Sequence, residues 1–264
     1  MSESGPEGPP PLVRLRWRRS WRLVPARFPP VPLFERVTDP ADLDVTLAIE
    51  ALTDPAVRDA VGELSAVAPA ERVSGPGSSP VMAAFTHPSP SGSRFAAPGR
   101  GVYYAARELP TAIAEVRFHR ARFLAATREP SIEVSMRAYV AGIDATLHDV
   151  RGAREAFPDA YVAAPDGYAR SAAFAGRLRD AGATGIAYDS VRRVGGQCVA
   201  LFRPRAPRPA VDRRRLRDPD AAGDVGAGLH SRFVWRARIA SREAPVRVAI
   251  SSTRSSKARY IAPS

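Results

Sequence analysis

Short apolar runs of the kind that form strands alternate with helix-like segments through the middle of the chain. This alternation limits the possible folds more than any other feature of the sequence. Runs rich in β-branched and aromatic residues lie at 81–85, 102–105, 132–140, 186–188 and 198–202. Because their order lacks a regular strand–helix–strand rhythm, it predicts an α/β (α+β) fold with a mixed β-sheet core and flanking helices.

Helix start and stop signals place two helices between these strands. Pro110 suits the first turn of a helix that runs to about Leu124. Asp166 is a suitable cap for a second helix over 168–181, and Gly182 is placed to end it. These two helices are among those expected to flank the sheet.

A different order of elements, one strand followed by helices, is predicted for the N-terminal third of the chain. A short strand is expected over 21–24, followed by two helices over about 39–52 and 54–64. The first helix follows aspartates that can cap it, and the second opens on an Asp-Pro pair. A Gly- and Pro-rich loop at 74–77 separates this helical region from the first strand of the middle segment.

The chain has one cysteine, Cys198, among 264 residues. An internal disulfide framework is therefore excluded, and the composition fits a reducing cytoplasm. No apolar run approaches the ~20 residues of a membrane span. Glu3 and Glu7 lie among prolines and glycines at the start of the chain, which argues against a secretory signal. A cytoplasmic location is expected.

The net charge of +12 is concentrated at the two ends of the chain. Residues 204–264 carry 14 Lys and Arg against 5 Asp and Glu, and residues 1–33 carry 6 against 2. The middle of the chain is close to neutral. Residues 1–20 and 206–264 are expected to be basic and disordered. Basic ends of this kind leave nucleic-acid binding open as an alternative function.

Common catalytic motifs are missing from the sequence. The chain has no GxGxxG after a strand, no GxxxxGK[ST], no GxSxG and no HExxH. The four histidines are scattered, so no metal site is expected. What remains is Arg94 beside a turn, Tyr103 and Tyr104 in a buried strand, and Glu115 among small apolar helix residues. From the residues alone, Glu115 is either exposed and ion-paired or held in a cleft.

Five motifs occur in a fixed order and carry a family resemblance: GSRF at 92–95, GVYYAA at 101–106, TAIAEVRFHR at 111–120, GIAYDS at 185–190 and CVALFRP at 198–204. In this order the chain resembles the RES-domain family, NAD+-degrading toxins of RES/Xre-type toxin–antitoxin systems. The resemblance covers about residues 21–205, with 34–75 as a helical insert. It implies a catalytic domain with a fold like that of the ADP-ribosyltransferases and diphtheria toxin.

The resemblance also implies roles for individual residues. Arg22 and Arg94 match the family arginines that suit the NAD+ pyrophosphate or an incoming phosphate. Tyr104 matches a tyrosine of the nicotinamide pocket, where its ring can stack on the cationic base. Glu115 matches the glutamate that stabilises positive charge on the ribose. Ser190 matches the family serine, expected to bind substrate or orient Glu115.

Four further residues are predicted to bind substrate: Tyr103, His119, Ser171 and Gln197. Two departures from the family pattern bear on substrate affinity. Many members have an asparagine shortly after the GSRF-type arginine, and many have asparagine where this chain has Gln197.

The implied reaction is cleavage of the nicotinamide–ribose bond by phosphorolysis, which gives ADP-ribose-1″-phosphate, or by hydrolysis. NAD+ is then a consumed substrate, phosphate a conceivable co-substrate, and no cofactor or metal is required. The expected partner is an Xre-type helix-turn-helix antitoxin, and a homodimer is left open. Three alternatives also stay open: protein ADP-ribosylation, an inactive binding module, and nucleic-acid binding through the basic ends.

Overall fold

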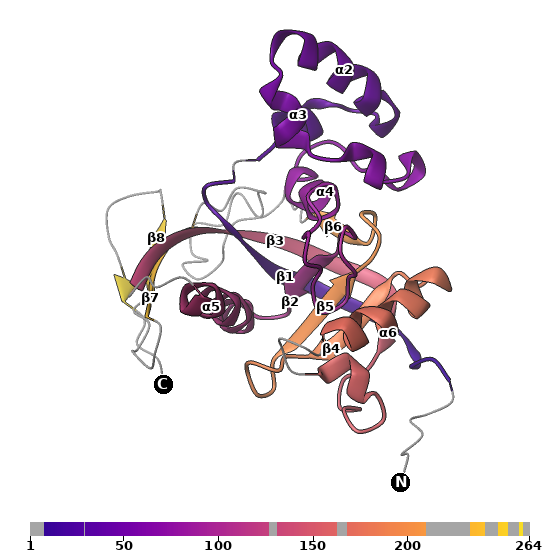
Figure 1. Ribbon diagram of the computed structural model, residues 1–264, viewed down its shortest axis with the longest axis vertical. Helices are drawn as coiled ribbons and strands as arrows, with labels where there is room; N and C mark the ends of the chain where they lie inside the picture. Colours follow the sequence, from indigo (N-terminus) through magenta and orange to yellow (C-terminus); the bar gives the residue numbers. More distant parts are fainter. Residues whose placement is uncertain are drawn as a thin grey trace.

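The computed structural model describes residues 8–28, 30–126, 131–162, 168–209, 233–240, 248–252 and 259–260. Its centre is a mixed β-sheet with flanking helices, as predicted (Figure 1). The central strands are β1 (Leu12–Pro25), β2 (Tyr103–Ala106), β3 (Ser131–Asp149), β4 (Gly185–Asp189) and β5 (Gln197–Leu201). Only β3 and β4 run parallel among these five; the other pairings are antiparallel.

The five central strands form a closed circuit of pairings. The order runs β1-β2-β5-β4-β3, and β3 also pairs with β1 along most of its length. The β1–β2 contact is much shorter, because its register contains the single pair Trp21 and Ala106. The closure brings the first strand of the chain next to strands that lie 80 or more residues later in the sequence.

The strand pleat divides the core into two layers. In β2 the ring of Tyr103 packs in one layer and the ring of Tyr104 lies toward the other, because successive side chains point to opposite faces. The same alternation separates Val199 from Cys198 in β5 and Ala187 from Tyr188 in β4. Tyr104, Cys198 and Tyr188 therefore share one face of the sheet.

Helices cover both faces of the sheet. The layer of Tyr103 is continuous with the buried residues of the N-terminal helices α1 (Pro32–Arg36), α2 (Leu43–Thr53), α3 (Ala56–Val61) and α4 (Ser79–Thr86), of which α4 packs on β2 and α2 and α3 lie farther from the sheet (Figure 1). The layer of Tyr104 packs against α5 (Leu109–Ala126) and α6 (Tyr168–Asp180), with the short 3-10 turn η4 (Pro158–Tyr161) beside α6. The remaining 3-10 turns are η1 (Pro40–Asp42), η2 (Leu64–Ala66) and η3 (Pro69–Glu71). In the part of the chain that the structure describes, no helix is both long and apolar enough to cross a membrane.

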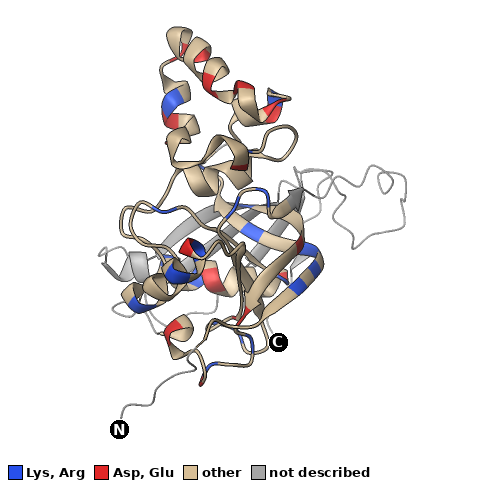
Figure 2. Ribbon diagram, turned by 90° about the vertical axis from the view of Figure 1, so that its right-hand side faces the viewer, with Lys and Arg blue, Asp and Glu red and all other residues tan. Residues whose placement is uncertain are grey.

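The N-terminal helices form an acidic region in a basic protein. Residues 34–64 carry eight Asp and Glu against two Lys and Arg, and the helices that carry these acidic positions lie at one end of the molecule (Figure 2). The basic excess of the whole chain therefore lies on the rest of the sequence.

The run 81–85, predicted as a strand, lies instead within helix α4. The amides of Val81 and Met82 both bond to the carbonyl of Ser78, as in the first turn of a helix. The helix is buried on nearly all sides, so its sequence is apolar throughout. A short apolar run of this kind looks the same in a buried helix and a buried strand.

Both ends of the chain are more ordered than the sequence predicts. Residues 12–20, expected to be disordered, form the first part of β1, with Leu15, Trp17 and Ser20 buried between exposed arginines. In the C-terminal part, β6 (Pro207–Pro209), β7 (Phe233–Ala240), β8 (Val248–Ser252) and β9 (Arg259–Tyr260) extend the sheet, with β6 and β7 on β3. Strand pairing there supplies the order that composition alone does not suggest. The other residues of 1–20 and 206–264 lie outside the described segments, apart from 8–11 and 206.

Candidate active site

A cleft of about 160 Å³ lies on the face of the sheet that carries Tyr104. It is lined by Arg22 of β1, Arg94 of the turn before β2, Tyr104 of β2, and Glu115 and His119 of α5. These residues are separated by up to 97 positions in the sequence, and the closed circuit of strands brings them together. Four of the five residues that the resemblance assigns to catalysis therefore line one cavity; the fifth, Ser190, is not among the lining residues and contacts Glu115.

Glu115 is held in this cleft by Ser190. The Ser190 Oγ donates a hydrogen bond of 2.6 Å to Glu115 Oε1. Ser190 Oγ itself accepts from the backbone N–H groups of Arg192 and Arg193, both at 3.1 Å. Because the serine proton is directed at the carboxylate and the lone pairs face backbone amides, Ser190 is arranged to orient Glu115 rather than to attack substrate.

Arg94 is a buried cation that is fixed by backbone carbonyls. The residue is 7% exposed, and its Nη1 donates to the carbonyls of Ala160 at 3.3 Å and Val162 at 3.0 Å. The guanidinium carbon lies 5.1 Å from the centroid of the Tyr168 ring, within cation–π range. Carbonyls and an aromatic face carry no full negative charge, so the positive charge of Arg94 remains available for an anionic ligand.

The turn that carries Arg94 is tied to Tyr104. The Tyr104 hydroxyl shares a hydrogen bond of 2.8 Å with Ser93 Oγ and accepts from the Phe95 amide at 2.9 Å. Gly92 opens the turn at φ 71°, and a Cβ there would lie 2.6 Å from the Ala96 carbonyl oxygen, so only glycine fits. Burial raises the pKa of Tyr104, which keeps the hydroxyl protonated and bound to the turn.

Arg22 is the second cation of the cleft. Its Nη1 donates to the Tyr104 carbonyl at 3.2 Å, and its guanidinium carbon lies 4.9 Å from the Tyr103 ring centroid. Its Nε is buried and has no hydrogen-bond partner among the described residues. Burial lowers the pKa of Arg22, although an arginine still keeps its charge at neutral pH. A buried donor without a partner at a cleft wall suits an anionic ligand.

Three predicted substrate-binding residues do not line the cleft. Tyr103 points to the opposite face of β2 and reaches the site only through its contact with Arg22. Ser171 is fully buried and donates to the Asp159 carbonyl at 2.6 Å. Gln197, at the start of β5, accepts hydrogen bonds from two arginine side chains outside the cleft. The fourth, His119, does line the cleft and is exposed, with its ring centroid 6.5 Å from that of Tyr168.

Sequence reasoning missed the apolar floor of the cleft. Trp21, Tyr188 and Cys198 line it, and the last two are paired across β4 and β5. Burial raises the pKa of the Cys198 thiol, with the nearby Glu115 charge adding to the effect, so the thiol stays protonated. Side chains alternate between the two faces of a strand, and Cys198 and Tyr188 lie on the same face of the sheet as Tyr104. This alternation could have identified both residues as part of the cleft.

The arrangement supplies one oriented carboxylate, two arginines and an aromatic, apolar floor. Such a site suits a ligand with an anionic part and a flat cationic or aromatic part. Among the described residues no three His, Cys, Asp or Glu side chains are grouped to hold a metal ion.

Comparison with known proteins gives one family match. A sequence profile described as "RES domain" matches residues 69–224, more than half of the chain. The matched range contains Arg94, Tyr104, Glu115 and Ser190, and leaves Arg22 outside. No curated protein matches the chain.

Among solved structures, the chain is similar to one titled "Crystal structure of the M.tuberculosis MbcT-MbcA toxin-antitoxin complex". The identity is 15%, the TM-score is 0.40, and the alignment covers 75% of this chain and 80% of that chain.

Proposed function

The chain belongs to the RES-domain family, and on that premise we propose that it consumes NAD+ by breaking the bond between nicotinamide and ribose. The observation that carries the proposal is the Glu115 carboxylate, fixed by Ser190 at 2.6 Å in a cleft that also contains Arg22 and Arg94. A fixed carboxylate beside two cations matches the charge pattern that this reaction requires.

Glu115 supplies the main electrostatic contribution in this mechanism. As the glycosidic bond breaks, positive charge develops on the ribose ring at C1, as in other glycoside cleavages. A carboxylate that accepts a hydrogen bond from the ribose 2-hydroxyl stabilises this charge more in the transition state than in the ground state. Ser190 holds the carboxylate in place before substrate binds, so little reorganisation is needed.

The arginines and Tyr104 bind the two ends of the substrate. Arg22 and Arg94 contact the pyrophosphate oxygens, and the Tyr104 ring stacks on the cationic nicotinamide. The cleft of about 160 Å³ is smaller than the ~300–1,000 Å³ of whole-ligand pockets. It therefore receives the nicotinamide riboside end, while the adenosine end lies outside.

The acceptor completes the reaction in one of two ways. Phosphate that attacks C1 yields nicotinamide and ADP-ribose-1″-phosphate, and water that attacks C1 yields nicotinamide, free ADP-ribose and a proton. Neither route requires a metal or a bound cofactor. NAD+ is the substrate in both.

We propose that the chain is a toxin whose cleft is covered by an Xre-type antitoxin, and that its fold is related to that of the ADP-ribosyltransferases. A cytoplasmic location follows from the substrate, and the single cysteine, Cys198, fits that compartment.

The test is loss of NAD+ from a solution of purified protein, with and without phosphate, followed by chromatography. Glu115→Gln keeps the size of the side chain and removes its charge, and Glu50→Gln on α2 is the matched control outside the cleft. We expect nicotinamide release by the wild type and by Glu50→Gln, and at least ~100-fold less by Glu115→Gln.

Three other outcomes are informative. NAD+ that survives in the folded wild type contradicts the proposal. Equal rates for wild type and Glu115→Gln contradict the assigned role of the carboxylate. Label that passes from the ADP-ribose part of NAD+ to a protein would instead identify a protein ADP-ribosyltransferase.

A further inference from the structure

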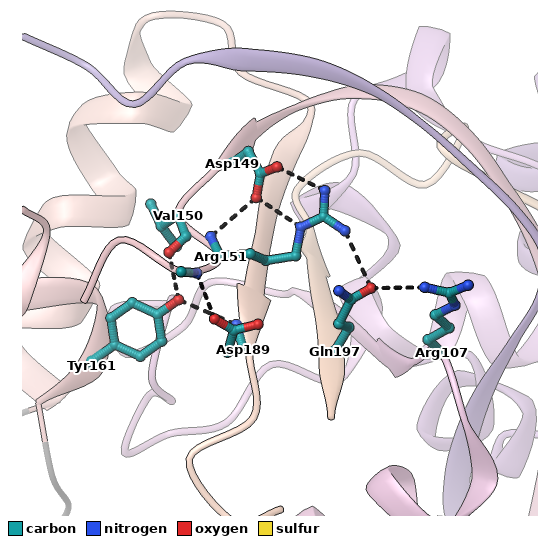
Figure 3. Close-up of polar contacts among 8 residues, drawn as sticks. Arg107, Asp149, Val150, Arg151, Tyr161, Asp189 and Gln197 are labelled. Carbon is teal, nitrogen blue, oxygen red and sulfur yellow. Dashed lines mark hydrogen bonds and ion pairs between the residues drawn. The ribbon is translucent and has the colours of Figure 1, made fainter. Parts of the chain in front are cut away.

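A polar network lies outside the cleft, at the carboxyl ends of the parallel strands β3 and β4 (Figure 3). Asp149 Oδ1 accepts from Arg151 Nε at 2.8 Å, and its Oδ2 accepts from Nη2 at 2.7 Å. Gln197 Oε1 accepts from Arg151 and Arg107, both at 3.2 Å. The proposed reaction uses none of these groups. Their effect is to fix the chain that leaves β3 against the start of β5.

Tyr161 is the last residue of η4, and its hydroxyl joins η4 to this region of the sheet. It donates to the Val150 carbonyl at 2.6 Å and accepts from the Asp189 amide at 3.2 Å (Figure 3). Asp189 Oδ2 accepts from the Gly152 amide at 2.6 Å, which adds a second link. Burial raises the pKa of Tyr161 to about 12, so the hydroxyl is protonated at neutral pH and can donate and accept at once.

The neighbours of Tyr161 hold one side of the cleft. Ala160 and Val162 flank Tyr161 in sequence, and their carbonyls are the two acceptors of Arg94 Nη1. Ser171 supports the same turn from α6 by its bond to the Asp159 carbonyl. Any displacement of η4 therefore moves the carbonyls that fix the Arg94 guanidinium.

The Asp189 amide connects the Tyr161 hydroxyl to the segment that holds Glu115. Asp189, whose amide it accepts from, directly precedes Ser190. Ser190 in turn holds Glu115 at 2.6 Å. Tyr161 thus belongs to the segment that positions the cation, and its hydroxyl contacts the segment that positions the carboxylate.

We propose that Tyr161 is a positioning residue that sets the Arg94 guanidinium against the Glu115 carboxylate. This inference rests on the proposed function, because the spacing of cation and carboxylate matters for a substrate that contacts both. Tyr161 does not line the cleft, so it acts through the η4 carbonyls and through Ser190. Small errors in such spacing are costly, since reacting groups must meet in one geometry.

The test is Tyr161→Phe, which removes only the hydroxyl and leaves the Val150 carbonyl and the Asp189 amide without this partner. We expect kcat/KM for NAD+ to fall on the order of tenfold. The matched control is Ser78→Ala, which removes a buried hydroxyl that donates to the Phe34 carbonyl at 2.7 Å, remote from the cleft. Its kcat/KM is expected to stay within about twofold of the wild type.

A double-mutant cycle separates positioning from a loss of stability. If Tyr161 acts through Arg94, Tyr161→Phe in an Arg94→Lys background costs less than about threefold, because the group that it positions is already altered. An undiminished tenfold loss in that background, or wild-type kinetics of Tyr161→Phe in the native background, would overturn the inference and leave the proposed function standing.

A second readout does not depend on activity. Amide hydrogen exchange at Asp189, measured by NMR, is expected to be faster in Tyr161→Phe than in Ser78→Ala. If the wild type leaves NAD+ intact, the proposed function fails. The exchange rate still tests whether the Tyr161 hydroxyl holds the Asp189 amide. Equal exchange at Asp189 in both variants would show that the hydroxyl does not fix this segment.

Discussion

Ser190 Oγ lies 2.6 Å from Glu115 Oε1 and donates to it, although 75 positions separate the two residues in the chain. The contact joins the end of strand β4 to the middle of helix α5. It gives the carboxylate a fixed orientation before any ligand is present, which is the condition for electrostatic stabilisation of a developing charge.

Removal of this donor should affect the chemical step more than substrate binding. We expect Ser190→Ala to lower kcat on the order of tenfold and to change KM for NAD+ by less than about twofold, since the contact matters most in the transition state. Steady-state kinetics with Ser78→Ala as control would check this. A rise in KM at constant kcat would mean that Ser190 contributes to binding instead.

Arg22 is expected to contribute to binding rather than to chemistry. Arg22→Gln should weaken NAD+ binding by about tenfold or more, because a charge-assisted contact to phosphate is lost. Arg14→Gln is the matched control on the same strand, where the side chain is exposed and pairs with Asp144. Calorimetry in the Glu115→Gln background measures binding without turnover. Equal affinity of the two arginine variants for NAD+ would contradict a role of Arg22 in binding.

Arg72 should matter for stability and not for activity. It is 4% exposed and donates to the carbonyls of Leu64 and Val67 and to Asp44, which ties the N-terminal helices together. Arg72→Ala is expected to lower the free energy of unfolding by about 2 kcal/mol, because buried carbonyls lose their donors. Urea unfolding would measure this, with Arg58→Ala, an exposed position on α3, as control. A change of less than about 0.5 kcal/mol would contradict the role.

The buried tyrosines predict sensitivity to alkaline pH. Burial raises the pKa of Tyr103 and of Tyr161 from 10.0 to about 12. The folded protein therefore holds protons that the unfolded chain releases first. The resulting stability is fully present below about pH 10 and is lost as pH rises toward 12.

Chemical unfolding measured across that range would reveal the effect. Tyr161→Phe should show a shallower loss of stability between pH 10 and 12 than the wild type, since one of the tyrosines with a raised pKa no longer titrates. Identical slopes for both proteins would show that Tyr161 ionises normally in the folded state.

The sequence predicted those elements whose signals are local. The strand at 102–105 and the helix from 110 to about 124 match β2 and α5 closely, because turn residues and a proline mark their limits. The Arg-rich half of β1 was missed because composition hid its alternation, in which Leu15 and Trp17 are buried between arginines. Its order comes from pairing with β3, more than 110 residues away, which no local pattern shows.

The candidate site, too, was predicted only in part from the sequence. The order of five motifs predicted the RES-domain family, which the sequence profile confirms. The motif order assigned both Tyr103 and Tyr104 to the substrate site, although neighbouring strand residues must point to opposite faces. Ser171 was also expected in the pocket, and only the folded chain shows that its hydroxyl supports η4 instead.

The closed circuit of strands has a seam at the cleft. The ladder between β1 and β3 runs from Leu12 to Pro25, whereas β1 meets β2 at the single pair Trp21 and Ala106, reinforced by the bond from Arg22 to the Tyr104 carbonyl. Both strands line the cleft at this point. Of the five junctions in this ring, the one between β1 and β2 has the fewest paired residues. A local separation of these two strands would therefore widen the cleft at the smallest loss of backbone pairing, and the other four ladders would keep their register.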